Sequence, residues 1–232
     1  MDRKTRLEAI STEIFFEIFD YLHALDIFTA FSSLNRRISS ILQIIPLRII
    51  ISDKHRRHHV DYLSSHLISH AHQVISLEVF DTIHDDLSII NLLFSQHKFI
   101  NLRSCTFISI HPSTKLKNVF EQIKSLNRLV SFSVCHPTLE KLNENVMKNL
   151  LETIFTHKSP SLHSIRLYVP CDYLNISKYK SIPSNLKSLH LHISSSTSQI
   201  FVDSIISIFR FCHLIEELAI ILRCSLLINS NK

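Results

Sequence analysis

The first 46 residues place apolar side chains at the spacing of short α-helices. The stretch 10–22 has an apolar residue at every fourth position, namely Ile10, Ile14, Ile18 and Leu22. Phenylalanines fill the neighbouring rows, and three acidic residues leave only one narrow polar stripe. Since apolar groups surround most of this predicted helix, we expect it to be buried on more than one face.

Two more short helices are predicted after it, over 23–34 and 35–42. Asp26 can accept hydrogen bonds from free backbone N–H groups, so it is the expected N-cap of the second helix. Pro46 ends this helical stretch, and the β-branched run 47–51 predicts a buried strand.

Beyond residue 73 the chain repeats a six-residue template with apolar residues at positions one, four and six. The six copies are VISLEV (74–79), LRSCTF (102–107), LVSFSV (129–134), LHSIRL (162–167), LKSLHL (186–191) and IEELAI (215–220). The first five carry serine at position three. The central residues, at position four, are Leu77, Cys105, Phe132, Ile165, Leu189 and Leu218. They recur every 24 to 33 residues, which is typical of proteins built from stacked repeats.

Segments with helical periodicity fill most of the intervals between these copies: 59–72, 85–97, 113–126, 138–157 and 198–212. The interval 168–183 contains two prolines and predicts a loop. Short strands alternating with longer helices predict an α/β solenoid, with a parallel sheet and helices along one side. Because side chains alternate along a strand, positions four and six face the helices. Positions three and five, and the residue that follows the template, which we call position seven, point away from the helices.

Composition narrows the functional classes. Hydrophobic residues make up 45% and charged residues 19%, as in an ordered globular chain. A net charge of +5 and one short basic stretch, 54–59, do not indicate a nucleic-acid partner. Glycine is absent, which excludes phosphate loops that depend on it. Five cysteines without a C-x-x-C motif predict neither a disulfide framework nor a zinc site, and a cytoplasmic or nuclear compartment is expected. No apolar run predicts a signal peptide or a membrane span.

The 16 histidines do not form a recognisable metal or catalytic motif. His66 and His70 have helical i, i+4 spacing and His190 and His192 share one strand face, but no further ligand completes either pair. No nucleophile-elbow motif is present. We therefore expect a protein without its own enzymatic activity, metal or cofactor.

The first 45 residues or so resemble an F-box. The resemblance lies in ISTEIFFEIFDYL, in LDIF after it, and in the three predicted helices. Ser11 stands where the family usually has proline, and Ile38 where it commonly has an aromatic residue. The resemblance implies an F-box domain over 1–46 that docks on a Skp-type adaptor and, through it, on a cullin–RING ubiquitin ligase. The adaptor-binding residues it implies are Ile10, Glu13, Ile14, Ile18, Phe19, Leu22, Ile27, Leu34 and Ile38.

Residues 47–232 resemble a divergent leucine-rich-repeat domain, although the asparagine that usually follows the strand is missing. The resemblance implies that this domain holds an unknown protein substrate on the sheet face. The chain would then be the substrate-recognition subunit of an SCF-type E3 ubiquitin ligase. The expected substrate contacts are Glu78, Phe80, Thr106, Ile108, Arg166, Tyr168, His190 and His192.

Two alternatives stay open at this point. The helical stretch can instead be a cap on the exposed end of the repeats, in a leucine-rich-repeat interaction scaffold without a link to a ligase. A loop, for example 168–183, can also fold over the sheet face and cover the expected substrate contacts.

Overall fold

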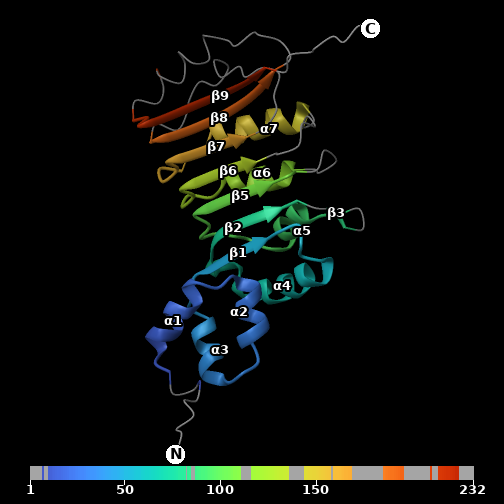
Figure 1. Cartoon of the computed structure of the whole chain (residues 1–232), viewed down its shortest axis with the longest axis vertical. Helices are drawn as coiled ribbons and strands as arrows, with labels where there is room; N and C mark the ends of the chain where they lie inside the picture. Colours follow the sequence, from blue (N-terminus) through green and yellow to red (C-terminus); the bar gives the residue numbers. More distant parts are fainter. Residues whose placement is uncertain are drawn as a thin grey trace, which may run out of the picture.

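The computed structural model describes residue 7 and residues 10–81, 83–84, 87–110, 116–135, 144–157, 159–168, 185–195, 210 and 214–224. The molecule is elongated, with three short helices at one end and a stack of strands above them (Figure 1). The helices are α1 (Thr12–Asp20), α2 (Ala24–Phe31) and α3 (Arg36–Leu42). We call residues 10–46, which contain them, the helical unit.

The strands form one parallel sheet in which neighbours in space follow the order of the chain. They are β1 (Leu47–Ile51), β2 (Val74–Phe80), β5 (Ser104–Ile108), β6 (Ser131–Cys135), β7 (Ser164–Tyr168), β8 (Ser188–Ser195) and β9 (Glu217–Cys224). The register follows the sequence template: each central residue is paired with the next one, from Leu77 with Cys105 to Leu189 with Leu218. The predicted parallel sheet is confirmed, and each repeated hexapeptide contributes one strand.

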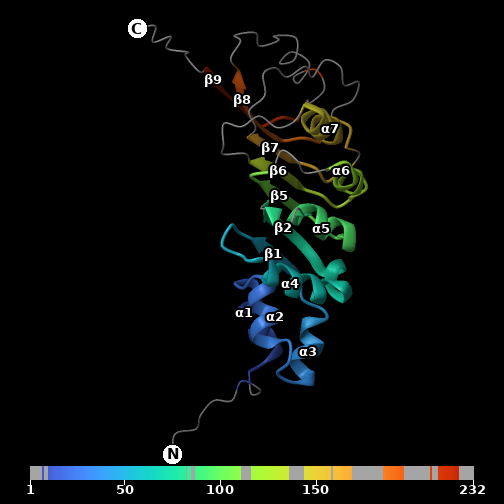
Figure 2. The ribbon, with the colours of Figure 1, turned by 90° about the vertical axis from the view of Figure 1, so that its right-hand side faces the viewer.

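Helices connect the strands and lie on one side of the sheet (Figure 2). They are α4 (Arg57–His70), the short 3₁₀-helix η2 (Ala71–Gln73), α5 (Ile89–Gln96), α6 (Lys117–Lys124) and α7 (Glu144–Phe155). This order of short strands and covering helices gives the α/β character that the sequence predicts. None of the described helices is long and apolar enough to cross a bilayer.

The core fills the space between the sheet and the helices. Positions four and six of the template are buried in β2, β5, β6, β7 and β8, as the alternation of side chains requires. In β9 the corresponding residues, Leu218 and Ile220, are only half-buried. The same cluster of buried residues continues without a break into the helical unit, where Phe15, Ile27 and Phe28 are almost fully buried.

Two helices begin at other residues than the sequence predicts. The second helix begins at Ala24 with His23 as its N-cap, so the prediction of Asp26 as N-cap is wrong; Asp26 lies in the first turn. The helix predicted over 85–97 begins only at Ile89, because β3 (Ile83–His84) and β4 (Leu87–Ser88) form a small hairpin before it. The Ser88 hydroxyl accepts a hydrogen bond from the Asn91 N–H and so caps α5. The helix predicted over 198–212 and the loop over 168–183 fall outside the described residues, apart from Tyr168 and Arg210.

Candidate functional site

The residues expected to bind an adaptor divide into three groups by burial. Phe19, Ile27 and Ile38 are 0–3% exposed and form part of the protein's own core. Ile10, Ile18 and Leu22 are half-buried against that core. Glu13, Ile14 and Leu34 are exposed, and they are the members of the set that a partner can reach directly. The buried group therefore has a structural role in the folded chain.

Other exposed apolar side chains of the helical unit were not predicted from the sequence. Tyr21, the C-cap of α1, is 87% exposed, and Ile44, in the turn after α3, is 67% exposed. With Ile14 and Leu34, at 48% and 49%, they form what we call the exposed apolar set. Tyr21 was predicted to lie on the apolar rows of the helix 10–22, but α1 ends at Asp20; Ile44 lies beyond the predicted helices, where helical periodicity gives no information about exposure.

Arg37 of α3 fixes the beginning of α1. Its Nη2 donates a 2.7 Å hydrogen bond to the carbonyl of Ile10 and lies 3.3 Å from the Thr12 hydroxyl. Its guanidinium also lies 5.8 Å from the centre of the Phe15 ring, within cation–π range. The pKa of Glu13 in the same turn is lowered by its own backbone N–H, by the Ser11 hydroxyl and by the charge of Arg37. Glu13 thus stays ionised and keeps this end of the exposed surface acidic.

The helical unit is attached to α4 and to the segment before β2 through polar contacts as well as apolar ones. The Tyr62 hydroxyl of α4 donates a 3.0 Å hydrogen bond to the carbonyl of Phe28, and the ring of His66 stacks on Phe28 at 4.6 Å. Gln73, just before β2, is buried, and its Nε2 donates hydrogen bonds to the carbonyls of Leu42 (2.9 Å) and Ile45 (2.8 Å). These contacts hold the helical unit against the first repeat, that is, against α4 and the short helix η2 that precedes β2.

The sheet face comprises the strand side chains that point away from the helices. The register aligns them in rows across the strands: position five holds Glu78, Thr106, Ser133, Arg166, His190 and Ala219, and position seven holds Phe80, Ile108, Cys135, Tyr168, His192 and Ile221. Position three holds Ser76, Ser104, Ser131, Ser164 and Ser188, which are half-buried. The register therefore places the eight expected substrate contacts in two adjacent rows. In these two rows Arg166, Tyr168 and Ile221 are exposed and Ser133 is buried. The other residues of the two rows whose side chains are described are half-buried.

A polar cluster lies at the β8 end of this face. The Ser188 hydroxyl donates a 3.0 Å hydrogen bond to Glu217 Oε2, and His190 Nε2 lies 3.1 Å from Oε1 of the same carboxylate. The proximity of His190, the Ser188 hydroxyl and the charge of Arg166 lower the pKa of Glu217. The carboxylate is ionised at neutral pH and partly balances the positive charge of Arg166.

The histidines of the helices have structural contacts. His70 Nδ1 lies 2.6 Å from Gln73 Oε1, and His97 Nε2 lies 2.8 Å from the Ser64 hydroxyl. His157 Nε2 donates a 2.9 Å hydrogen bond to the Ile123 carbonyl, while its Nδ1 accepts from the Ser159 N–H. Among the described residues, no group of three or more His, Cys, Asp or Glu side chains is arranged to hold a metal ion.

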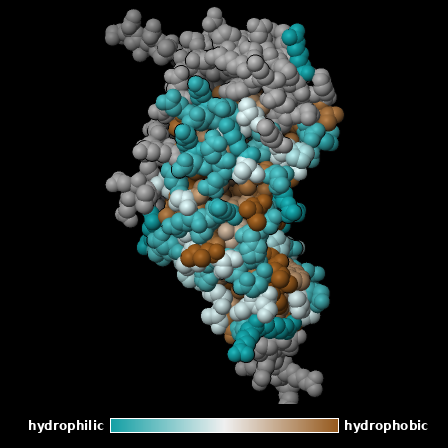
Figure 3. Space-filling view, turned by 180° about the vertical axis from the view of Figure 1, so that it is seen from behind, coloured by the Kyte–Doolittle hydropathy of each residue, from teal (hydrophilic) through white to brown (hydrophobic). Residues whose placement is uncertain are grey.

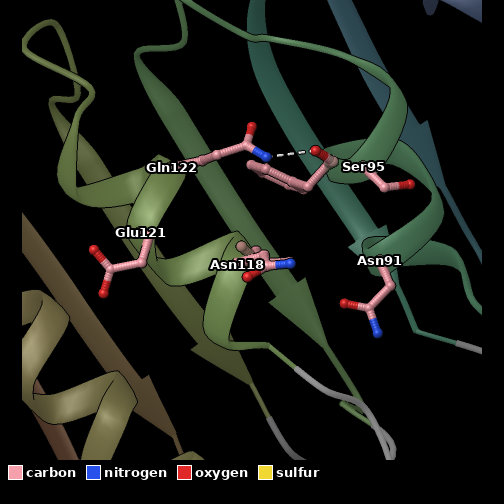
Figure 4. Close-up of a pocket in the computed structure, with 7 residues that line it drawn as sticks. Asn91, Ser95, Asn118, Glu121 and Gln122 are labelled. Carbon is pink, nitrogen blue, oxygen red and sulfur yellow. Dashed lines mark hydrogen bonds between the residues drawn. The ribbon is translucent and has the colours of Figure 1, made fainter.

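The helical side of the molecule carries small hydrophobic areas separated by hydrophilic ones (Figure 3). A groove of about 600 Å³ lies between α5 and α6. Asn91 and Ser95 face it from α5, and Asn118, Glu121 and Gln122 face it from α6 (Figure 4). Gln122 Nε2 donates a hydrogen bond to the carbonyl of Phe94, and this bond connects α6 with α5, the helices of two consecutive repeats. None of the predicted contact residues lines it.

Comparisons with known proteins give no family for this chain. No family model matches it, and no curated protein sequence matches it at a significant level.

Proposed function

We propose that the chain is the substrate-recognition subunit of an SCF-type ubiquitin ligase, a proposal based on the F-box resemblance of residues 1–46. The helical unit would dock on a Skp-type adaptor, and the repeats over 47–232, which resemble leucine-rich repeats, would hold a protein substrate. Ubiquitin transfer would then depend on proximity, because tethering raises the effective concentration of substrate lysines near the ligase.

The exposed apolar set is the observation that carries this proposal. Ile14, Tyr21, Leu34 and Ile44 stay exposed although other apolar side chains of the helical unit are buried in the core that it shares with the sheet. Burying one such side chain against a partner contributes about 1.5–3 kcal/mol before the costs of association. A partner can therefore reach these side chains without unfolding of the helical unit.

A specific observation favours a second candidate, the interaction scaffold with a helical cap. The helical unit packs on the first repeat through Phe28, Tyr62 and Gln73, and the core is continuous across this boundary. Under this alternative the three helices cover the end of the sheet beside β1 and bind no adaptor.

Co-purification with a recombinant Skp-type adaptor separates the two candidates. We expect the wild-type chain to retain the adaptor, and we expect Ile14→Asp and Leu34→Asp to weaken the complex at least about tenfold, since each removes an apolar contact and adds a charge. Ile68→Asp is the matched control, because Ile68 is an isoleucine 81% exposed on α4, outside the helical unit.

All three substitutions are at exposed positions, so each variant should keep the wild-type melting temperature within about 2 °C. Failure of the folded wild-type chain to retain the adaptor would reject the ligase proposal and leave the scaffold. Equal loss of binding in Ile68→Asp would show that the effect is not specific to the helical unit.

A further inference from the structure

Over the four strands from β2 to β7, the sheet face has a charged side chain on each outer strand and an apolar row along one side. At position five, Glu78 on β2 is separated from Arg166 on β7 by Thr106 and Ser133, which carry hydroxyl groups. At position seven, Phe80, Ile108 and Cys135 form an apolar row that ends at Tyr168. In Figure 2 the helices α4 to α7 all lie on the opposite side of the sheet. The charge of the face therefore changes from negative to positive across the strands, from β2 to β7. Along each strand the face changes from polar at position five to mostly apolar at position seven.

The spacing of the rows fits a helix better than an extended segment. Neighbouring strands lie about 4.8 Å apart, so three steps from β2 to β7 cover about 14 Å. Three turns of an α-helix advance about 16 Å, whereas the same-face side chains of an extended segment advance about 20 Å in three steps. A helix also satisfies its own backbone hydrogen bonds, while an extended chain lying across the middle of a sheet finds no free strand edge to pair with.

We propose that the sheet face binds one amphipathic α-helix of a partner protein, laid across β2, β5, β6 and β7 with its amino end at Glu78 and its carboxyl end at Arg166. The partial positive charge of a helix amino end then meets Glu78, and the partial negative charge of its carboxyl end meets Arg166. The apolar stripe of the helix packs on the row from Phe80 to Tyr168. A partner helix with basic residues in its first turn and acidic residues in its last turn fits this charge order.

This inference deepens the proposed receptor function, since the helix would belong to the substrate, but its test uses the isolated chain without an adaptor. Two synthetic peptides of about 14 residues serve as probes, both acetylated and amidated, with leucines at i, i+4, i+7 and i+11 on an alanine background. One peptide carries two lysines in its first turn and two glutamates in its last turn; the other carries two glutamates in both its first and its last turn, so it cannot match both charges in either direction. Binding is measured by fluorescence anisotropy at low salt.

We expect the wild-type chain to bind the first peptide about three- to tenfold more tightly than the second, the range given by one or two exposed charge contacts. Glu78→Lys should invert this preference, because β2 and β7 then both present a positive charge. Arg103→Glu is the matched control, because Arg103 is exposed one residue before β5 and lies outside the rows of position five and position seven; it should leave the preference unchanged. Ile108→Ser should weaken both peptides by a similar factor, since it shortens the apolar row.

Equal affinity for the two peptides, no saturable binding of either, or a preference that Glu78→Lys leaves unchanged would each overturn the proposed docking mode. None of these outcomes bears on adaptor capture, which depends on Ile14 and Leu34. Conversely, a chain that prefers the first peptide but captures no adaptor would keep the helix site and lose the ligase assignment.

Discussion

Replacing Gln73 by leucine should strongly destabilise the protein, because one buried carboxamide connects the helical unit to the sheet. Gln73 Nε2 donates to the carbonyls of Leu42 and Ile45, and its Oε1 lies 2.6 Å from Nδ1 of His70. Since both amide hydrogens are used, Oε1 is the acceptor and His70 Nδ1 is the donor. Leucine has a similar volume but no hydrogen-bonding group, so three buried polar groups lose their partner.

The expected loss follows from the cost of leaving those groups unpaired. Each buried group without a partner costs about 1–3 kcal/mol, and partial relaxation of the turn before β1 brings the sum to about 3–5 kcal/mol. For a chain of 232 residues, each kcal/mol lowers the melting temperature by about 2–4 °C. We therefore expect the melting temperature of Gln73→Leu to fall by about 6–20 °C.

Thermal unfolding followed by circular dichroism measures this shift, with Gln43→Leu as the matched control. Gln43 is the exposed C-cap of α3, so its replacement should change stability by no more than about 0.5 kcal/mol. Hydrogen exchange should also show faster opening of α1 to α3 in Gln73→Leu than in the control. A shift no larger than that of Gln43→Leu would refute the role assigned to Gln73.

Further predictions concern backbone strain and pH. Ser109 has φ = 52° in a chain without glycine, so Ser109→Gly should raise stability by about 0.5–1 kcal/mol in urea unfolding. Ser125→Gly, at φ = −81°, should lower it; a gain at both sites would contradict the strain argument. Burial lowers the pKa of His157 below the usual value of 6.5, against the opposing effect of its bond to Ile123, and burial also lowers the pKa of His97. Burial thus favours the neutral form of both imidazoles, so their contribution to stability should be constant only above about pH 7.5 and should decrease as the pH falls through 6.5. His157→Gln should flatten this decrease in melting temperature between pH 7 and pH 5, and an unchanged slope would show that His157 is not responsible.

The strands and their register could be predicted because two constraints act together. Each hexapeptide buries positions four and six, and a shift of one residue would turn all of its apolar side chains away from the helices. The serines at position three mark the same point in five copies, so aligning the sequences also aligns the strands. The 83–88 hairpin was missed because it depends on contacts that carry no periodicity. Ser88, for example, donates a 2.6 Å hydrogen bond to the buried Asp81.

The candidate surface of the helical unit was predicted less well, for a related reason. Helical periodicity identifies which residues are apolar, but it does not tell which part of the protein covers them. Phe19, Ile27 and Ile38 were expected to contact an adaptor, yet the chain itself covers them. Tyr21 and Ile44 lie in turns, where no repeating pattern separates exposed from buried positions. Only the packing of three helices against the first repeat distinguishes these cases.

The attachment of the helical unit has a consequence for the proposed ligase subunit. Adaptor docking would use residues such as Ile14 and Leu34, while the sheet face presents Glu78 and Arg166, so the two partners do not compete for a side chain. Their relative orientation depends on the contacts of Phe28, Tyr62 and Gln73 between them. A variant that loosens this boundary while both surfaces stay folded should bind each partner normally and still transfer ubiquitin more slowly, because proximity without fixed orientation gives a lower effective concentration.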